Sequence, residues 1–369
     1  ASLDIGTSVP HSYAWQLPDN KTKRQAMQHE IVEQLPLLQA NGTLTEPGWA
    51  RHPHWQYQRQ AVAASSWRIK EWDYYAVVSP EQFAICLTAS NLGYIGLYAI
   101  CLVDLALGRS WQIDTLQPLP LGRHAFPETA DSGAIQFSNG QLSLQIERIG
   151  GEHRVHFSSA QFQGPHGRGI EGELTLRLPA QHESMNIATS WAEQRKAFYY
   201  NTKLNCLQAS GQFRQAGKHY HLSPVRDLGV LDWGRGVWTY NNTWYWASAS
   251  GYVDGEPFGL NLGYGFSDRS PASENLLLYR GVAHKLDQVA FHFDRKNWLK
   301  PWQMRSNDGR LQLDFTPCVD RNSKLNLLLL ASEQHQVFGH YRGHVTLDNG
   351  QVLQLNHLPG FAEEVRNRW

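Results

Sequence analysis

One segment of the chain places an acid and a base among an unusual number of tryptophans. Residues 231–251, LDWGRGVWTYNNTWYWASASG, contain Asp232, Arg235 and four of the fourteen tryptophans. A carboxyl group among aromatic side chains loses water contacts, which raises its pKa towards the range of a general acid, and a nearby arginine lowers that pKa again. The segment therefore predicts either a catalytic acid at Asp232 with Arg235 tuning its charge, or a structural ion pair between the two.

Two residues further along could supply a second acid-base group. Glu274 and Asn275 precede the apolar run LLLYRG, at the expected mouth of a strand, and His284 follows in an expected neighbouring strand. If Asp232 and Glu274 converge, two carboxyl groups from separate strands provide the acid and the base of a glycoside-cleaving or hydro-lyase reaction. The alternative for Glu274 is a hydrogen bond to a loop backbone or an ion pair with a neighbouring arginine.

Aromatic residues of the same region predict the wall of a pocket. In an extended strand, Trp244 and Trp246 share one face and form a flat platform for a ring-shaped or apolar ligand, or they pack between two sheets. Asn261 points away from its leucine neighbours, so its amide is available to a ligand oxygen. The predicted ligand-binding residues are Trp233, Trp238, Tyr240, Trp244, Trp246, Asn261 and Asn275.

The composition restricts the class of protein. The chain has 33 basic and 33 acidic residues without a long run of like charge, which argues against a nucleic-acid partner or a polybasic membrane anchor. No stretch reaches transmembrane length, and the first twenty residues lack the pattern of a signal peptide. We therefore expect a soluble, cytoplasmic protein whose partner is a small molecule; the oligomeric state is not indicated.

Motifs for cofactors and metals are missing from the sequence. It contains no glycine-rich nucleotide-binding loop, serine-hydrolase elbow or zinc-protease motif. His219 and His221 would share one face of a strand, but no carboxylate at a fixed offset completes a metal site. The four cysteines lie far apart, without metal-finger spacing, and are expected to be buried reduced thiols. We predict no cofactor and no metal.

Strand-like segments separated by turn residues dominate the chain. Asn-Gly or Asp-Gly pairs at 139–140, 254–255, 308–309 and 349–350 predict hairpin turns. The length exceeds what one hydrophobic core usually supports. We predict an all-β protein of two antiparallel barrel or sandwich lobes, with an N-terminal arm over 1–60 that includes a short helix near 23–38, a first β-domain over 61–225 and a second over 226–369.

Ordered segments over nearly the whole chain resemble one family. They include PGWAR (47–51), KEWDYY (70–75), DWGRGVW (232–238), WYWASASG (244–251), GLNLGYG (259–265), FGHYRG (338–343) and GFAEEVRNRW (360–369). Together they are similar to the family catalogued as domain of unknown function 2804. The resemblance implies a calycin-like (lipocalin-like) fold of two β-domains, as in carotenoid 1,2-hydratase-like and tocopherol cyclase-like proteins.

The resemblance also implies a role for one residue. In the hydratase-like relatives, an aspartate in an aromatic-flanked segment early in the second domain is thought to protonate an alkene, and Asp232 resembles it. Those relatives favour a histidine beside the acid, where this chain has Gly234 and Arg235.

The residues and the resemblance together predict a cofactor-independent enzyme. It would perform acid-base chemistry of the hydratase, cyclase, lyase or glycoside-cleaving kind on a neutral small molecule in an aromatic-lined cleft. The alternative is a non-catalytic, lipocalin-like binding protein for a hydrophobic small molecule, and a third hypothesis is an interaction scaffold with an exposed aromatic patch. Convergence of Asp232, Arg235 and Glu274 in a concave pocket would distinguish the enzyme from the other two.

Overall fold

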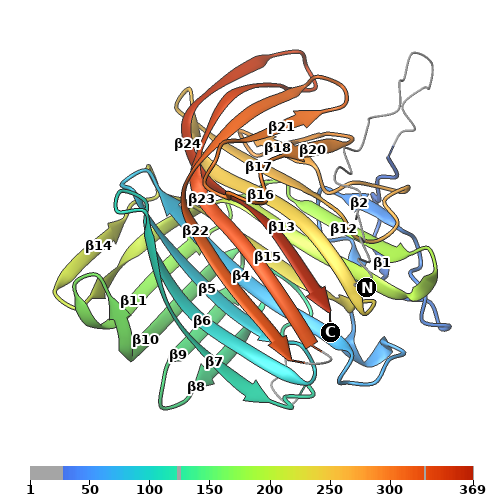
Figure 1. Cartoon of the computed structure of the whole chain (residues 1–369). Coiled ribbons are helices and arrows are strands. Elements are labelled where there is room, and N and C mark those ends of the chain that lie inside the picture. Colours follow the sequence, from blue (N-terminus) through green and yellow to red (C-terminus); the bar gives the residue numbers. More distant parts are fainter. Residues whose placement is uncertain (1–27, 123–125, 328–329, 369) are drawn as a thin grey trace, which may run out of the picture.

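Almost every regular element of the protein is a β-strand (Figure 1). The computed structural model describes residues 28–122, 126–327 and 330–368. Within these residues there are 24 strands and one 3-10 helix, η1 (Arg59–Ala61). This confirms the predicted all-β class.

The strands form two large antiparallel sheets and one small parallel pair, β1 (Leu35–Pro36) with β3 (Trp55–Gln56). The first sheet contains β2 (Gly48–Ala50), β4 (Ile69–Ser79), β5 (Phe83–Asn91), β6 (Ile95–Asp104), β7 (Arg109–Pro118), β8 (Gly133–Ser138), β9 (Ser143–Ile149), β10 (Glu152–Gly164), β11 (Gly167–Arg177), β12 (Met185–Trp191), β13 (Gln194–Gln215), β14 (Lys218–Leu222) and β15 (Leu228–Val237). The second sheet contains β16 (Asn241–Val253), β17 (Glu256–Tyr264), β18 (Leu276–Tyr279), β19 (Val282–Lys285), β20 (Val289–His292), β21 (Trp302–Ser306), β22 (Leu311–Leu327), β23 (Leu330–Thr346) and β24 (Val352–Arg368).

Each sheet curls around a core of its own, and the two sheets also pack against each other. Because side chains alternate along a strand, one set of residues enters the sheet's own core and the other set faces the partner sheet. On β15, Leu231 and Trp233 belong to the core of the first sheet, whereas Val230 packs between the sheets. Figure 1 shows β22, β23 and β24, coloured orange to red, crossing the face of the first sheet.

The four predicted hairpin turns are confirmed. Residues 139–140 join β8 to β9, 254–255 join β16 to β17, 308–309 join β21 to β22, and 349–350 join β23 to β24. In the second of these turns, Asp254 has a φ of 52° and Gly255 a φ of 78°. Positive values at both positions are those of a type I′ turn, which matches the twist of the flanking strands.

The predicted N-terminal helix is not present in the described residues. Residues 23–27 of that prediction lie outside them, and residues 28–38 are extended: Glu30 bridges to Trp49, and β1 follows. The buried side chains of Ile31 and Leu37 fix this segment against the first sheet, and Pro36 has no N–H for a helical hydrogen bond.

The change from one sheet to the other falls between Val237 and Asn241. The predicted boundary at 225/226 assigns β15 to the second half, but β15 pairs with β4 and β13 of the first sheet. Asp232 therefore lies on the last strand of the first sheet. The division into domains stays a prediction.

All four cysteines are free thiols. Cys86, Cys101 and Cys206 are buried, and Cys318 is half-buried. Within the described part of the chain, we find no helix with the length and hydropathy that crossing a bilayer requires.

Candidate functional site

Antiparallel register places two rows of side chains opposite each other. On the first sheet, Lys203, Asp232 and Tyr74 are direct cross-strand neighbours on β13, β15 and β4. On the second sheet, the corresponding row on β16, β24, β23 and β22 consists of Trp246, Glu363, Gln336 and Arg321. All of these residues line one cavity between the sheets, with a volume of about 550 Å³. This volume suits a small molecule.

The cavity has an aromatic inner part and a polar rim. The inner part is lined by Trp72, Tyr199, Trp238, Trp244, Trp246 and Phe266, together with Lys203, Asp232, Glu274 and Glu363. Trp238 stacks on Phe266 with ring centroids 4.9 Å apart, and it meets Trp244 edge to face at 5.4 Å. Of the predicted pocket residues, Trp238, Trp244 and Trp246 line this cavity. The rim carries Ser110, Gln112, Asp114, Asn322, Ser323, Ser332 and Gln334, none of which is buried.

Asp232 is held by two donors from β13. Lys203 Nζ lies 2.9 Å from Asp232 Oδ2, and Asn201 Nδ2 donates to Asp232 Oδ1 at 2.6 Å. The Lys203 ammonium also lies 3.9 Å from the centroid of the Trp246 ring. This cation–π contact connects β13 of the first sheet with β16 of the second. Lys203 thus occupies the place beside Asp232 that the sequence analysis gave to Arg235. Its signal in the sequence is the run NTKLN, in which Asn201, Lys203 and Asn205 stand at every second position.

Glu274 reaches the cavity from the loop between β17 and β18. Its carboxyl group is buried beside Gly263, where a β-carbon would collide with it, and the Tyr199 hydroxyl donates to Glu274 Oε2 at 3.4 Å. Burial raises the pKa of Glu274; the charge of Lys203 lowers it and that of Asp232 raises it further. The structure therefore brings Asp232 and Glu274 to one cavity.

Asn261 supports the cavity wall from behind. Its Oδ1 accepts a hydrogen bond from Trp246 Nε1 at 2.7 Å, and its Nδ2 donates to the backbone oxygen of Glu274, also at 2.7 Å. Both ends of the amide are thus bonded to residues that line the cavity, while Asn261 itself is fully buried. Its place in the structure is that of a positioning residue for Trp246 and Glu274.

Glu363 is a third buried carboxyl group, and it is not among the site residues predicted from the sequence. Trp244 Nε1 donates to its Oε1 at 2.9 Å and Gln336 Nε2 to its Oε2 at 3.0 Å. Burial raises the pKa of Glu363 to about 7, against the smaller lowering effects of the Trp244 hydrogen bond and the Lys203 charge. The signal in the sequence is the acidic pair at 363–364 with apolar residues directly before and after it.

The raised pKa of Glu363 predicts a dependence of stability on pH. Since the pKa rises from an ordinary 4.5 in the unfolded chain to about 7 in the fold, the folded state binds this proton more tightly. The stability gained in this way is complete below pH 4.5 and is lost as the pH rises through about 7. Glu363→Gln should remove up to about 3 kcal/mol of this dependence. Urea unfolding of both proteins between pH 5 and 8 measures the difference, and parallel curves would contradict the assignment.

Arg235 is not brought to Asp232. They are three positions apart on β15, so their side chains leave opposite faces of the strand. Arg235 Nη1 donates to Asp73 Oδ1 at 2.9 Å, and the guanidinium lies 4.0 Å from the centroid of the Trp233 ring, all within the first sheet's own core. The expected ion pair with Asp232 is therefore replaced by one with Asp73, and Trp233 is a core residue.

The other predicted site residues also lie away from the cavity lining. His284 Nδ1 is 3.3 Å from Asp348 Oδ2 and accepts from the Asp348 backbone N–H. Asn275 accepts from the Gly263 N–H and donates to the Asp287 carbonyl, so it fixes the loop beside Glu274. Tyr240 is 46% exposed, between β15 and β16.

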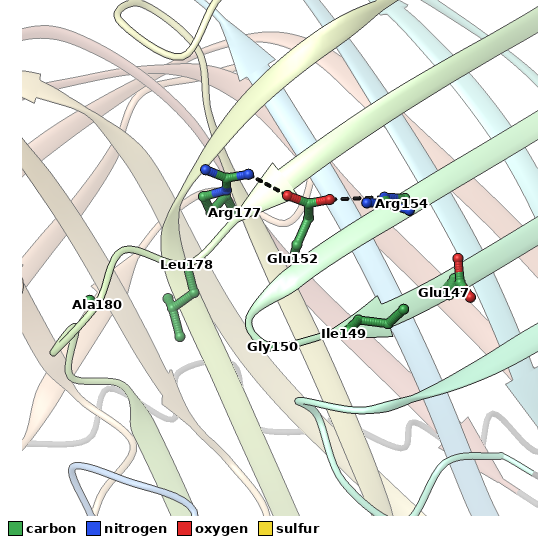
Figure 2. Close-up of a pocket in the computed structure, with 8 residues that line it drawn as sticks. All are labelled: Glu147, Ile149, Gly150, Glu152, Arg154, Arg177, Leu178 and Ala180. Atoms are coloured by element: carbon green, nitrogen blue, oxygen red, sulfur yellow. Dashed lines mark hydrogen bonds and ion pairs between the residues drawn. The ribbon is translucent and has the colours of Figure 1, made fainter.

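A second hollow, at the β9–β10 turn and the end of β11, is of a different kind (Figure 2). It is about 470 Å³ in volume, and its central carboxylate, Glu152, is bonded to both Arg154 and Arg177. These bonds lower the pKa of Glu152. None of the charged side chains that line it is buried, so this hollow lacks the buried ionisable groups of the cavity between the sheets.

Metal-binding clusters are also absent from the residues described. No group of three or more histidine, cysteine, aspartate or glutamate side chains among them has an arrangement that could hold a metal ion. His219 and His221 lie side by side on β14, with ring centroids 6.4 Å apart.

The fold and the cavity define a calycin-like protein with two curled antiparallel sheets. The family model described as domain of unknown function (DUF2804) matches residues 28–369, and the chain belongs to this family. No curated protein matches the chain.

Solved structures of similar fold have low sequence identity. CghA is 10% identical over 81% of this chain and 88% of its own, with a TM-score of 0.50. A putative AttH from Nitrosomonas europaea is 14% identical over 84% and 95%, with a TM-score of 0.49. Kievitone hydratase from Nectria haematococca is 9% identical over 80% and 88%, with a TM-score of 0.47. At these identities the likeness concerns the fold alone.

Proposed function

We propose that the protein is an enzyme that uses its own side chains for acid-base chemistry on a neutral small molecule in the cavity between the sheets. The observation that carries this proposal is the meeting of three buried carboxyl groups, Asp232, Glu274 and Glu363, around the Lys203 ammonium in one aromatic-walled cavity. Burying such groups costs several kcal/mol each unless they are paired, so a wall that served packing alone would be apolar. Groups of this kind in a cleft are typical of catalytic sites.

The reaction class follows from the groups available. Carboxyl groups in different environments give one acid and one base, which suffices for hydration, elimination, cyclisation or glycoside cleavage. Asp232, Glu274 and Glu363 are the three groups from which we infer this pair to be drawn. Aromatic walls favour a substrate with a ring or an apolar body, and the pairing of Lys203 with Asp232 leaves no isolated charge for an ionic substrate at that point.

A ligand screen tests the proposal. Sugars, terpenoids and phenolics would be compared by thermal shift, and each compound that raises the Tm would be incubated with the protein and analysed by mass spectrometry. We expect at least one compound both to stabilise the protein and to be converted. Binding without conversion would instead support the lipocalin-like binding protein, to which the aromatic inner wall is also suited. A screen without any binder would count against both.

Trp244→Ala should weaken binding of such a compound by about 10–100-fold. The substitution removes an aromatic face of the cavity and a hydrogen bond to Glu363, together worth about 1.5–3 kcal/mol. Calorimetric titration with the best binder measures the loss. Trp67→Ala is the matched control, since Trp67 is 55% exposed and is not part of the cavity lining. Equal affinities of the two variants would contradict the placement of the ligand.

A further inference from the structure

We propose that Glu363 is the proton donor of this site and that Asp232 is the carboxylate that receives a proton. The assignment rests on the proposed function and deepens it. It differs from the expectation drawn from the sequence, in which Asp232 donates the proton.

The hydrogen bonds of the two carboxyl groups distinguish their roles. Asp232 has a positive partner, the Lys203 ammonium at 2.9 Å, which compensates the negative charge of a carboxylate. Glu363 is bonded to two neutral donors, the indole N–H of Trp244 and the amide of Gln336, at 2.9 and 3.0 Å. A buried carboxyl group with neutral partners is more readily kept in its uncharged form. The two carboxyl groups thus lie in one cavity, one with a positive partner and the other with neutral partners.

The orientation of Gln336 fixes where the proton of Glu363 points. Gln336 Oε1 accepts from Arg321 Nη1 at 2.7 Å and from the Tyr74 hydroxyl at 3.1 Å, so the amide nitrogen must face Glu363. Arg321 is itself held by two bonds to Gln112 Oε1 on β7, at 2.9 and 2.7 Å. Because both protein partners of Glu363 are donors, neither accepts its proton, which leaves that proton available to a ligand atom in the cavity.

Ionisable groups on several elements around Glu363 affect its pKa, and the buried Glu274 lines the same cavity. Lys203 on β13 and Arg321 on β22 lower the pKa of Glu363, and Asp232 on β15 raises it. The tyrosines Tyr74 on β4 and Tyr199 on β13 are buried, with pKa values raised well above 10, so they stay neutral and add no charge at pH 7. Burial is the largest effect, and it raises the pKa of Glu363 to about 7.

The proposed proton transfers balance over one cycle. The O–H bond of Glu363 breaks, an electron pair of the ligand forms the new bond to that proton, and Glu363 becomes a carboxylate. Asp232 accepts a proton from the ligand or from a water molecule that attacks it, and passing that proton through the cavity to Glu363 restores both groups. Protons are conserved and no oxidant or reductant is needed.

Infrared spectroscopy tests the protonation state without a substrate. Protonated carboxyl groups have a carbonyl stretch apart from the amide bands, and we expect a signal of this kind to disappear from the wild-type spectrum as the pH rises through about 7. Glu363→Gln should abolish it, while the adjacent Glu364→Gln, whose carboxylate pairs with Arg295 at 2.8 Å, should leave it in place. Trp244→Phe should raise the pH midpoint of this signal. The hydrogen bond from Trp244 stabilises the carboxylate form of Glu363 and lowers its pKa, and the variant lacks this bond. Persistence of the signal in Glu363→Gln would overturn the assignment.

Turnover of a compound that the wild type converts tests the donor role. Glu363→Gln should lower kcat by about 10²–10⁴-fold and remove the fall in rate on the alkaline side of pH 7, whereas Glu364→Gln should keep the wild-type pH profile. Full activity in Glu363→Gln together with its loss in Asp232→Asn would refute the inference and leave the proposed function standing. If the wild type converts no compound, the proposed function fails and the donor role fails with it.

Discussion

Asp232→Asn should lower turnover by about 10²–10⁴-fold while the fold is retained. Asparagine has nearly the same size and keeps an oxygen for Lys203, but it cannot take up a proton. The new amide N–H₂ would face the Asn201 side chain. The Oδ1 of Asn201 has no hydrogen-bond partner among the described residues, so rotation of the Asn201 amide would let this oxygen accept the new hydrogen bond. The substitution then removes the negative charge beside Lys203, which affects the chemistry of the site more than the packing of its side chains.

Steady-state kinetics on a converted compound, with the Tm of each variant, measures this effect. Asp114→Asn is the matched control, because Asp114 is an exposed carboxylate on the rim of the same cavity. Unchanged turnover in a folded Asp232→Asn protein would remove Asp232 from the mechanism. A loss of turnover that is accompanied by a large fall in Tm would point to a structural role.

Arg235→Met should lower the free energy of unfolding by about 3–5 kcal/mol. Arg235 is fully buried and bonded to Asp73, to the Trp72 and Gly234 carbonyls and to the Pro127 carbonyl. Burial lowers the pKa of Arg235 to about 10, so it remains charged at neutral pH. Without Arg235, the Asp73 carboxylate keeps its ion pair with Arg148 but loses the one with Arg235. Its negative charge is then only partly compensated in the buried core.

Urea unfolding measures the change, and Arg280→Met provides the comparison. Arg280 pairs with Glu256 at the surface, where an ion pair contributes little to stability because water and salt screen the charges. An Arg235→Met protein of normal stability but reduced turnover would instead favour the interpretation from the sequence, in which Arg235 tunes the charge of Asp232.

The fold was largely predictable because its signals are local. Asn-Gly and Asp-Gly pairs specify tight hairpins wherever they occur, and alternation of side chains placed Trp244 and Trp246 on one face, both of which line the cavity. The same alternation of side chains also places Asp232 and Arg235 on opposite faces of the strand, because their positions differ by an odd number. The prediction of their interaction was therefore wrong for a reason that was already present in the sequence.

The composition of the site could be predicted only in part because its members come from distant strands. Lys203 and Asp232 meet through the register of β13 with β15, and Glu363 meets Gln336 through that of β24 with β23. The register between strands that are far apart in the sequence is fixed by the packing of whole sheets. Which residues of the two sheets meet in the cavity also depends on how one sheet packs against the other. Neither has a signature within a short stretch of residues.

The central position of β24 has a consequence for synthesis on the ribosome. β24 lies between β16 and β23 and pairs with both, yet it is translated after every other strand described. Until it emerges, β16 and β23 each expose an unpaired edge, which is a template for pairing with other chains. We therefore expect nascent chains stalled before residue 352 to bind chaperones or aggregate, and the site to be complete only once the strand that carries Glu363 has left the exit tunnel.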